Sequence, residues 1–333
     1  MFKSKRFLAL LAVTVLAVAL VASPGFAAAK AAKDMKIAVV TDVGGLGDQS
    51  FNDAAYRGLK QVEKELGAKI TVVESKKMDD YETNLRSLAD QKYDMIWAIG
   101  FLMTDAVKNV APQYPNTKFG IIDSVVDAPN VLSVTFKEEE GSFLQGVIAG
   151  MVTKTNKIGF IGGMEFPLII KFETGFRAGV KAVNPKAQVF VAYTGKFDDP
   201  GKGKELAMTQ FSQGADIIYH AAGACGIGVI EAAKEKKLYA IGVDSDQSHL
   251  APNNVVSSML KRVDVGVFDG SKQVINGTFK GGLKVLGLKE NGVGTAFSKG
   301  VKLPANILKK HDYYLKQIAA GKLKVPSTRE ELK

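Results

Sequence analysis

Short apolar runs alternate along the chain with segments whose apolar residues recur every three or four positions. Such runs, rich in β-branched residues, are typical of buried parallel strands, and the longer period between them is typical of amphipathic helices. Strands separated by helices of this length predict a parallel sheet covered on both faces. The runs that we interpret as strands cover residues 37–40, 69–73, 94–99, 118–122, 131–136, 157–161, 188–193, 216–220, 239–243 and 255–260.

The alternation restarts after a predicted helix at 138–153 that is rich in glycine and other small residues. We therefore predict an α/β fold with two Rossmann-like lobes, each a parallel sheet flanked by helices, and a ligand cleft between them. The first lobe is expected over 35–137 with a returning segment near 263–280. The second is expected over 138–262 with a C-terminal segment 281–333.

The first predicted strand leads into a glycine-rich turn that carries candidate binding groups. The strand ends at Asp42, and a helical pattern begins near Phe51, directly after Ser50 and before Asn52. Open α/β sheets bind ligands at the carboxyl ends of their strands, where helices begin. A carboxylate, a hydroxyl, a ring and an amide suit a flat polar ligand, whereas Asp42 and Asp48 would repel a phosphate.

Further polar and aromatic residues follow the ends of other predicted strands in both halves of the chain. They are Phe101, Asp123, Phe197, Asp244 and Lys261. If the two lobes face each other, these strand ends line one cleft that can close on a ligand.

The first 27 residues have the features of a cleavable signal peptide. Lys3, Lys5 and Arg6 precede an apolar run at 7–21, and small residues follow it. The run is short for a membrane span. The only cysteine is Cys225, so we expect no disulfide and no lipid-anchoring cysteine after the apolar run, and an exported, periplasmic protein.

The chain is basic, with 44 Lys and Arg against 34 Asp and Glu and a net charge of +10. Loss of three positive charges with the signal peptide would leave 10 − 3 = +7. No stretch interleaves aromatic residues with arginine, so we expect no nucleic-acid partner. We interpret the charge as a solvated surface that favours an anionic membrane or an acidic partner.

Enzymatic motifs are not found in the sequence. It contains no G-x-S-x-G, H-E-x-x-H or Walker A pattern, and its three histidines are dispersed. We therefore expect no enzyme activity, no catalytic residues, no metal and no cofactor. A signalling or adhesion module with the same fold stays open as an alternative.

Ten segments of the chain resemble the basic membrane protein family, the substrate-binding proteins of certain ABC transporters. They lie in one order and span essentially the whole chain after the predicted signal peptide. They read TDVGGLGDQSFNDAAYRG, IGFLMTDAV, FGIIDS, FKEEEGSFLQGVIAG, IGFIGG, ETGFRAGV, YTGKFDDPGKGKELA, HAAGACGIGVIEAA, IGVDSDQ and SSMLKRVD.

The resemblance implies the fold of the type I periplasmic binding proteins and, in its cleft, a ligand site for a purine nucleoside. Phe51 and Phe197 would stack on the base, Asp42 and Asp123 would accept hydrogen bonds, and Asp244 with Lys261 would hold the ribose. The remaining wall would contain Ser50, Asn52, Gly100, Phe101, Met103 and Gly223. The implied partners are a membrane permease and its ATPase, with the binding protein itself a monomer.

Other interpretations of these residues remain. The aspartates could cap turns or helices, Phe51 could be a core residue, and Lys261 could lie on the surface. Trp97 is expected in the core. Another flat heteroaromatic such as a flavin or free base, or a sugar, is the alternative ligand.

Overall fold

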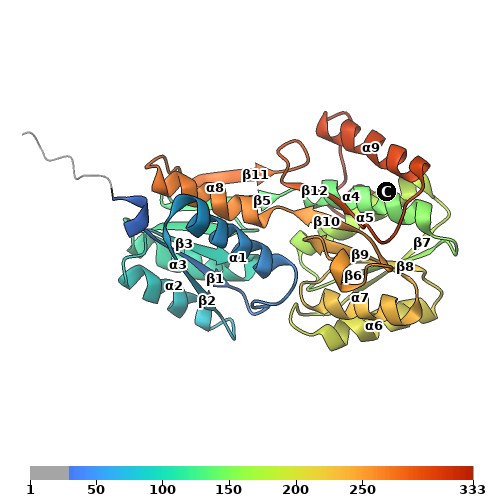
Figure 1. Cartoon of the computed structure of the whole chain (residues 1–333), viewed down its shortest axis with the longest axis horizontal. Coiled ribbons are helices and arrows are strands. Elements are labelled where there is room, and N and C mark those ends of the chain that lie inside the picture. The colour runs from blue at the N-terminus through green and yellow to red at the C-terminus, as the bar shows by residue number, and fades with distance from the viewer. Residues whose placement is uncertain (1–29, 333) are drawn as a thin grey trace, which may run out of the picture. The chain divides into compact units, whose positions relative to one another are not determined.

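The computed structural model describes residues 30–332 (Figure 1). The predicted signal peptide at 1–27 lies outside the described residues. Residues Ala31–Lys333 form one compact unit, which contains two sheets of six strands each. This confirms the predicted fold class of two α/β lobes.

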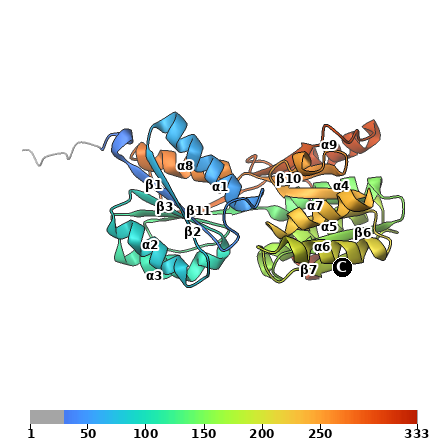
Figure 2. The ribbon, with the colours of Figure 1, turned by 60° about the horizontal axis from the view of Figure 1, so that its bottom comes forward.

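The sheet of the first lobe is parallel throughout and has the order β11-β5-β4-β3-β1-β2. Helices α1 and α8 cover one face, and α2 and α3 cover the other (Figure 2). The elements are β1 (Lys36–Thr41), α1 (Phe51–Gln61), β2 (Lys69–Glu74), α2 (Asp80–Asp90), β3 (Met95–Ile99), α3 (Thr104–Val110), β4 (Lys118–Ile122), β5 (Val131–Phe136), α8 (Val263–Ile275) and β11 (Gly282–Leu286).

The second lobe repeats this architecture with the order β12-β10-β9-β8-β6-β7. Helices α4 and α5 lie on one face, α6 and α7 on the other, and α9 packs on α4. Only β12 is antiparallel to its neighbour. The elements are α4 (Glu138–Val152), β6 (Lys157–Gly162), α5 (Pro167–Val183), β7 (Gln188–Tyr193), α6 (Pro200–Ser212), β8 (Ile217–Ala221), α7 (Cys225–Lys236), β9 (Tyr239–Asp244), β10 (Val255–Lys261), β12 (Val293–Phe297) and α9 (Ala305–Ala319).

Within residues 30–332 the chain passes between the sheets three times: after β5, after β10 and after β11 (Figure 1). Strand β11 pairs with β5 in the first sheet. The boundary that we expected at residue 281 therefore falls one strand too early. Sequence periodicity could not show this, because a short edge strand carries no signal for the sheet that it joins.

The small residues of α4 allow close packing of α4 on α5. A Cβ atom on Gly146 would lie 2.1 Å from the carbonyl oxygen of Phe176 on α5, so only glycine permits this approach. Among the described residues no helix is both long and apolar enough to span a membrane.

Trp97 lies in the core of the first lobe, as expected. Its side chain is completely buried in β3, and its indole N–H donates to the Ser271 hydroxyl on α8 at 3.0 Å. The ring lies over Gly120 of the neighbouring strand β4, where a Cβ atom would come 2.2 Å from a ring carbon. The absence of a side chain at Gly120 therefore makes room for the indole.

Gly120→Ala should destabilise the fold by about 1–3 kcal/mol, because the new methyl group overpacks the indole. The control is Gly294→Ala on β12, where a Cβ atom meets nothing within 4 Å. Urea unfolding of both variants measures the difference. Equal stabilities of the two variants would contradict this account of the core.

Candidate functional site

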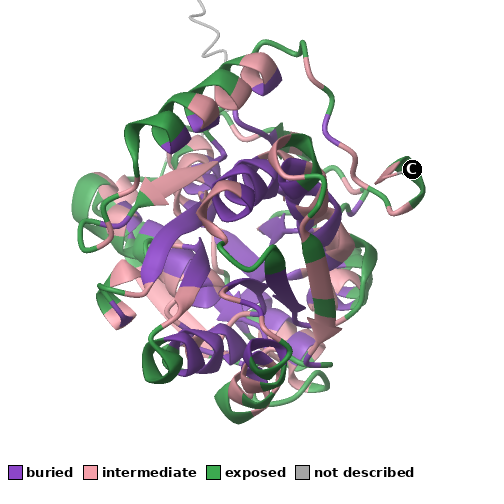
Figure 3. Ribbon diagram, turned by 90° about the vertical axis from the view of Figure 1, so that its right-hand side faces the viewer, coloured by how far each residue is buried: buried purple, intermediate pink, exposed green. Residues whose placement is uncertain are grey.

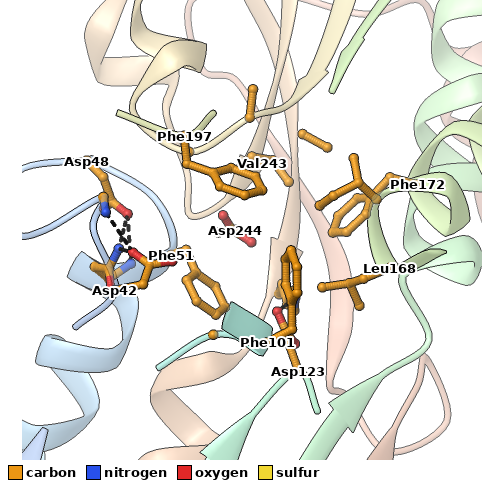
Figure 4. Close-up of a pocket in the computed structure, with 18 residues that line it drawn as sticks. Asp42, Asp48, Phe51, Phe101, Asp123, Leu168, Phe172, Phe197, Val243 and Asp244 are labelled. Carbon is orange, nitrogen blue, oxygen red and sulfur yellow. Dashed lines mark hydrogen bonds and ion pairs between the residues drawn. The ribbon is translucent and has the colours of Figure 1, made fainter. Parts of the chain in front are cut away.

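A cavity lies where the strand ends of the two lobes meet (Figure 4). It contains about 540 Å³ of space not filled by protein atoms, its open mouth included. Ten of the twelve predicted site residues line it: Asp42, Phe51, Asn52, Gly100, Phe101, Asp123, Phe197, Gly223, Asp244 and Lys261. The cavity thus draws on both lobes, as the strand-end argument predicts.

Two predicted wall residues lie elsewhere. The hydroxyl of Ser50 donates to Oδ2 of Asp244, so Ser50 stands behind that carboxylate. Met103 is completely buried among the side chains of the α2 and α3 face. Both follow strand ends in the sequence, but the turn directs their side chains away from the cavity.

The turn after β1 places two buried carboxylates at the first-lobe wall. The amide nitrogen of Asn52 donates to Asp42 at 2.8 Å and to Asp48 at 3.2 Å. Asp48 also accepts the backbone N–H groups of Ser50, Asn52 and Asp53, and so caps α1. Asp42 accepts the N–H of Gly44 at 2.9 Å. The capping interpretation therefore holds fully for Asp48 and in part for Asp42.

Burial changes the protonation of this pair. It raises the pKa of Asp42 from 3.8 to about 6, although hydrogen bonds from Asn52 and Gly44 oppose the change. It raises the pKa of Asp48 to about 7 in the same way. The side-chain oxygen of Asn52 is buried without a hydrogen-bond partner, so it can accept a hydrogen bond from a ligand.

A buried lysine stands at the second crossing between the lobes. Nζ of Lys261 lies 2.5 Å from Oδ2 of Asp123 and 3.3 Å from Oε1 of Glu138. All three side chains are at least 96% buried. Sequence reasoning missed Glu138, whose only signal is its position directly after β5.

Lys261 is close to three carboxylates here, and Lys171 also pairs with one of them, Glu138, at 3.3 Å. Although burial opposes the charge, Asp123, Glu138 and Asp244 together raise the pKa of Lys261. Burial raises the pKa of Asp123 and of Asp244, and Lys261 offsets this only in part. Oδ1 of Asp123 has no hydrogen-bond partner. The cluster can therefore accept hydrogen bonds from ligand hydroxyl groups.

Asp123 and Asp244 occupy equivalent places at the ends of β4 and β9. Both have left-handed backbone conformations, with φ of 69° and 62°. This region is sparsely populated by residues other than glycine, and such conformations concentrate at functional sites. Among the hydrogen bonds of residues 30–332, neither carboxylate accepts a backbone N–H, so neither is a turn cap.

Aromatic rings line the cavity beside this cluster, and Nζ of Lys261 lies 5.0 Å from the ring centre of Phe51. Phe51 comes from the first lobe and Phe197 from the second, and both point inward (Figure 4). Phe101 meets Phe197 edge-on at 6.2 Å. The sequence did not predict the cavity-lining residues at the start of α5, because apolar residues in the first turn of a helix cannot be distinguished from core residues by their pattern. These missed residues are Leu168, Ile169 and Phe172.

Contacts between the lobes flank the cavity. The ring of Phe101 lies 5.1 Å from that of Phe166. On another side Arg57 donates to the Ser245 hydroxyl at 2.7 Å. Separation of the lobes would break these contacts and widen the mouth of the cavity.

Comparison with known proteins identifies the family of the chain. Residues 35–328 match the family described as "ABC transporter substrate-binding protein PnrA-like". The chain belongs to this PnrA-like family. Proteins of the family bind a small molecule outside the cytoplasmic membrane and serve a permease with its ATPase, which is a transport role and not an enzymatic one.

Relatives extend over nearly the whole chain. The "ABC transporter nucleoside-binding protein BmpA" of Lactococcus lactis is 36% identical over 351 residues, covering 97% of this chain and 99% of the relative. The "CD4+ T-cell-stimulating antigen" of Listeria monocytogenes is 39% identical over 320 residues, 89% of each chain. A solved ABC transporter solute-binding protein from Aeropyrum pernix superposes with a TM-score of 0.82 at 30% identity, covering 90% of this chain and 95% of that one.

The ligand-free PnrA-like protein should lose stability from Asp42 as pH rises from 5 to 7.5. The folded pKa of about 6 exceeds the ordinary 3.8, so the folded state binds more protons in this window. This contribution is complete below pH 3.8 and is lost as pH rises through 6. Asp42→Asn should reduce the fall of the free energy of unfolding with pH, which urea unfolding at several pH values measures.

The control is Asp105→Asn, at a carboxylate that is 91% exposed, which should leave the pH dependence of the free energy of unfolding unchanged. The same pH dependence in both variants would refute the assignment to Asp42.

Lys261→Met should destabilise the protein by about 3–5 kcal/mol at pH 7.5, because it leaves the buried carboxylate of Asp123 without its cation. The loss should shrink at pH 5, because the pKa of Asp123 is raised to about 7 by burial. The control is Lys284→Met, which breaks a half-exposed pair with Asp269 and should cost less than about 1 kcal/mol. A pH-independent loss at Lys261 would argue against this role of its pair with Asp123.

Proposed function

We propose that this protein binds a purine nucleoside in the cavity and delivers it to the permease of an ABC importer. The observation that carries the proposal is the make-up of the cavity wall. Phenyl rings from both lobes line it together with the cluster of Asp123, Asp244 and Lys261, and Nζ of Lys261 lies 5.0 Å from the ring centre of Phe51. A nucleoside likewise joins a flat base directly to a hydroxylated sugar.

The rings suit the base. Among the ring contacts of residues 30–332, Phe51 and Phe197 do not touch each other, although both line the cavity. A flat heterocycle can therefore lie between them. Stacking of a base on an aromatic side chain contributes about 1–3 kcal/mol and tolerates different bases. The polar edge of the base would meet Asp42 and the free oxygen of Asn52.

The carboxylate cluster suits the ribose. Hydrogen bonds from hydroxyl groups to a carboxylate are about twice as strong as neutral ones. Lys261 opposes the effect of burial on the pKa of both Asp123 and Asp244, which favours their ionised, hydrogen-bond-accepting form. A ligand without these hydroxyl groups would leave buried carboxylates unpaired, and the site should discriminate against it.

The Lactococcus lactis relative, whose name describes it as nucleoside-binding, supports the same ligand class. We further propose that the chain is exported by its N-terminal signal and acts in the periplasm as a monomer. Relatives from Pyrococcus carry the name lipoprotein, whereas the first 224 residues here contain no cysteine.

Phe51→Ala should weaken the binding of purine nucleosides and free purines alike, by about 5- to 100-fold, because both lose stacking. Asp244→Ala should weaken nucleosides much more than free purines. Titration calorimetry on protein refolded without ligand measures both. The control is Phe279→Ala, at a ring that lies outside the cavity against Lys118.

Equal losses for nucleosides and free purines at Asp244 would remove the ribose assignment. Binding of a flavin or a sugar, with no binding of any nucleoside, would retain the transport role and overturn the proposed ligand.

A further inference from the structure

The segment at 298–326, which contains α9, is strongly basic. It holds seven lysines and a single acidic residue, Asp312. The lysines are Lys299, Lys302, Lys309, Lys310, Lys316, Lys322 and Lys324.

This basic segment accounts for the surplus charge of the described chain. Of the 44 basic residues, three lie within residues 1–29 and one is Lys333, so residues 30–332 hold 40 basic and 34 acidic side chains. That surplus of six equals the surplus of the basic segment alone. The rest of the described chain is therefore balanced, and the charge is not a general property of the surface.

Ion pairs leave the basic segment largely uncompensated. Lys324 lies 3.5 Å from Glu331. Among the ion pairs of residues 30–332, none involves any of the other six lysines of the segment. Lys310 lies instead over the rings of Tyr313 and Tyr314, at 5.5 Å and 5.3 Å. The single acid, Asp312, interacts with His311.

Helix α9 presents lysines and a tyrosine on one side. It buries Ile307, His311 and Ile318, and its outer side is exposed at the top of Figure 3. Lys309, Tyr313 and Lys316 follow at spacings of four and three residues, which puts them on the same side of the helix.

Apolar surface is exposed on the same helix. Tyr313 is 52% exposed, and Leu308, about 100° around the helix from Lys309 and at the flank of that side, is 36% exposed. Lysine stems with charged tips and tyrosine rings are the side chains that accommodate a boundary between water and lipid. A basic helix face with aromatic and apolar residues is typical of helices that lie on anionic membranes.

We propose that the outer side of α9 binds the surface of a bilayer that contains anionic phospholipids. Negative headgroups attract unpaired lysines near the surface, and Tyr313 with Leu308 reaches the headgroup region. None of the seven lysines lines the cavity, so ligand binding and membrane binding use separate parts of the second lobe. The contact would keep the binding protein near the bilayer that holds its permease.

The test is co-sedimentation with vesicles, using the chain from Lys30 onward because the apolar first 29 residues would bind lipid themselves. Vesicles of phosphatidylglycerol and phosphatidylcholine should bind the protein, and vesicles of phosphatidylcholine alone should not. Removal of three charges in Lys309→Gln/Lys316→Gln/Lys322→Gln should weaken binding about 100-fold, at about fivefold per lysine. Salt at 1 M should abolish binding.

The matched control removes three exposed lysines elsewhere, as Lys64→Gln/Lys234→Gln/Lys236→Gln. It has the same net charge and should bind nearly as well as the wild type. Equal weakening in both triple variants would show a net-charge effect and overturn the proposal, as would the absence of binding to anionic vesicles. Nucleoside binding should stay unchanged in both, which separates this test from the proposed transport function.

A fluorescence measurement tests the contact itself. The only tryptophan, Trp97, is completely buried, so Tyr313→Trp adds a single exposed reporter. Its emission should shift to shorter wavelength with anionic vesicles. Co-sedimentation without that shift would place the contact elsewhere. Retention on immobilised polyglutamate without vesicle binding would assign the face to an acidic protein instead.

Discussion

The buried charge of Lys261 is the constraint around which the two lobes are joined. It sits at the end of β10, where the chain leaves the second sheet, and pairs with Asp123 at the end of β4 in the first. Glu138, at the start of α4, approaches the same ammonium group. A buried charge requires close partners, and these partners come from different lobes. The cluster therefore ties the strand ends into one site beside the crossings between the lobes.

The same cluster explains why the cavity has hydrogen-bond acceptors available for a ligand. Nζ of Lys261 is shared by Asp123 and Glu138, and among the described residues Oδ1 of Asp123 and the side-chain oxygen of Asn52 have no hydrogen-bond partner. Buried acceptors without donors are costly. A ligand that supplies hydroxyl and N–H donors completes them, and so stabilises the closed arrangement of the lobes. The same hydrogen bonds would therefore give both the affinity for the ligand and the stability of the closed lobes.

Charge has a different role on the outer surface. In the cavity, burial strengthens the electrostatic interaction between each charged group and its partners. The lysines of the basic segment, in contrast, stay solvated and largely unpaired. Solvated charges act over about 8 Å at physiological ionic strength, which suits recognition of an extended surface and not of one small molecule. The protein therefore carries a specific polar site and a diffuse basic surface in separate places.

The local sequence pattern was enough to predict the two lobes and most of the residues that line the cavity. Strand ends of a parallel sheet meet at one edge, so Asp42, Asp123 and Asp244 could be placed from the sequence. Tertiary structure alone decided what depends on side-chain direction and contacts between distant segments. It directed Met103 into the core, set Ser50 behind Asp244, added Phe172 to the wall and assigned β11 to the first sheet. The reason is that periodicity records which face of an element is buried, but not which distant element buries it.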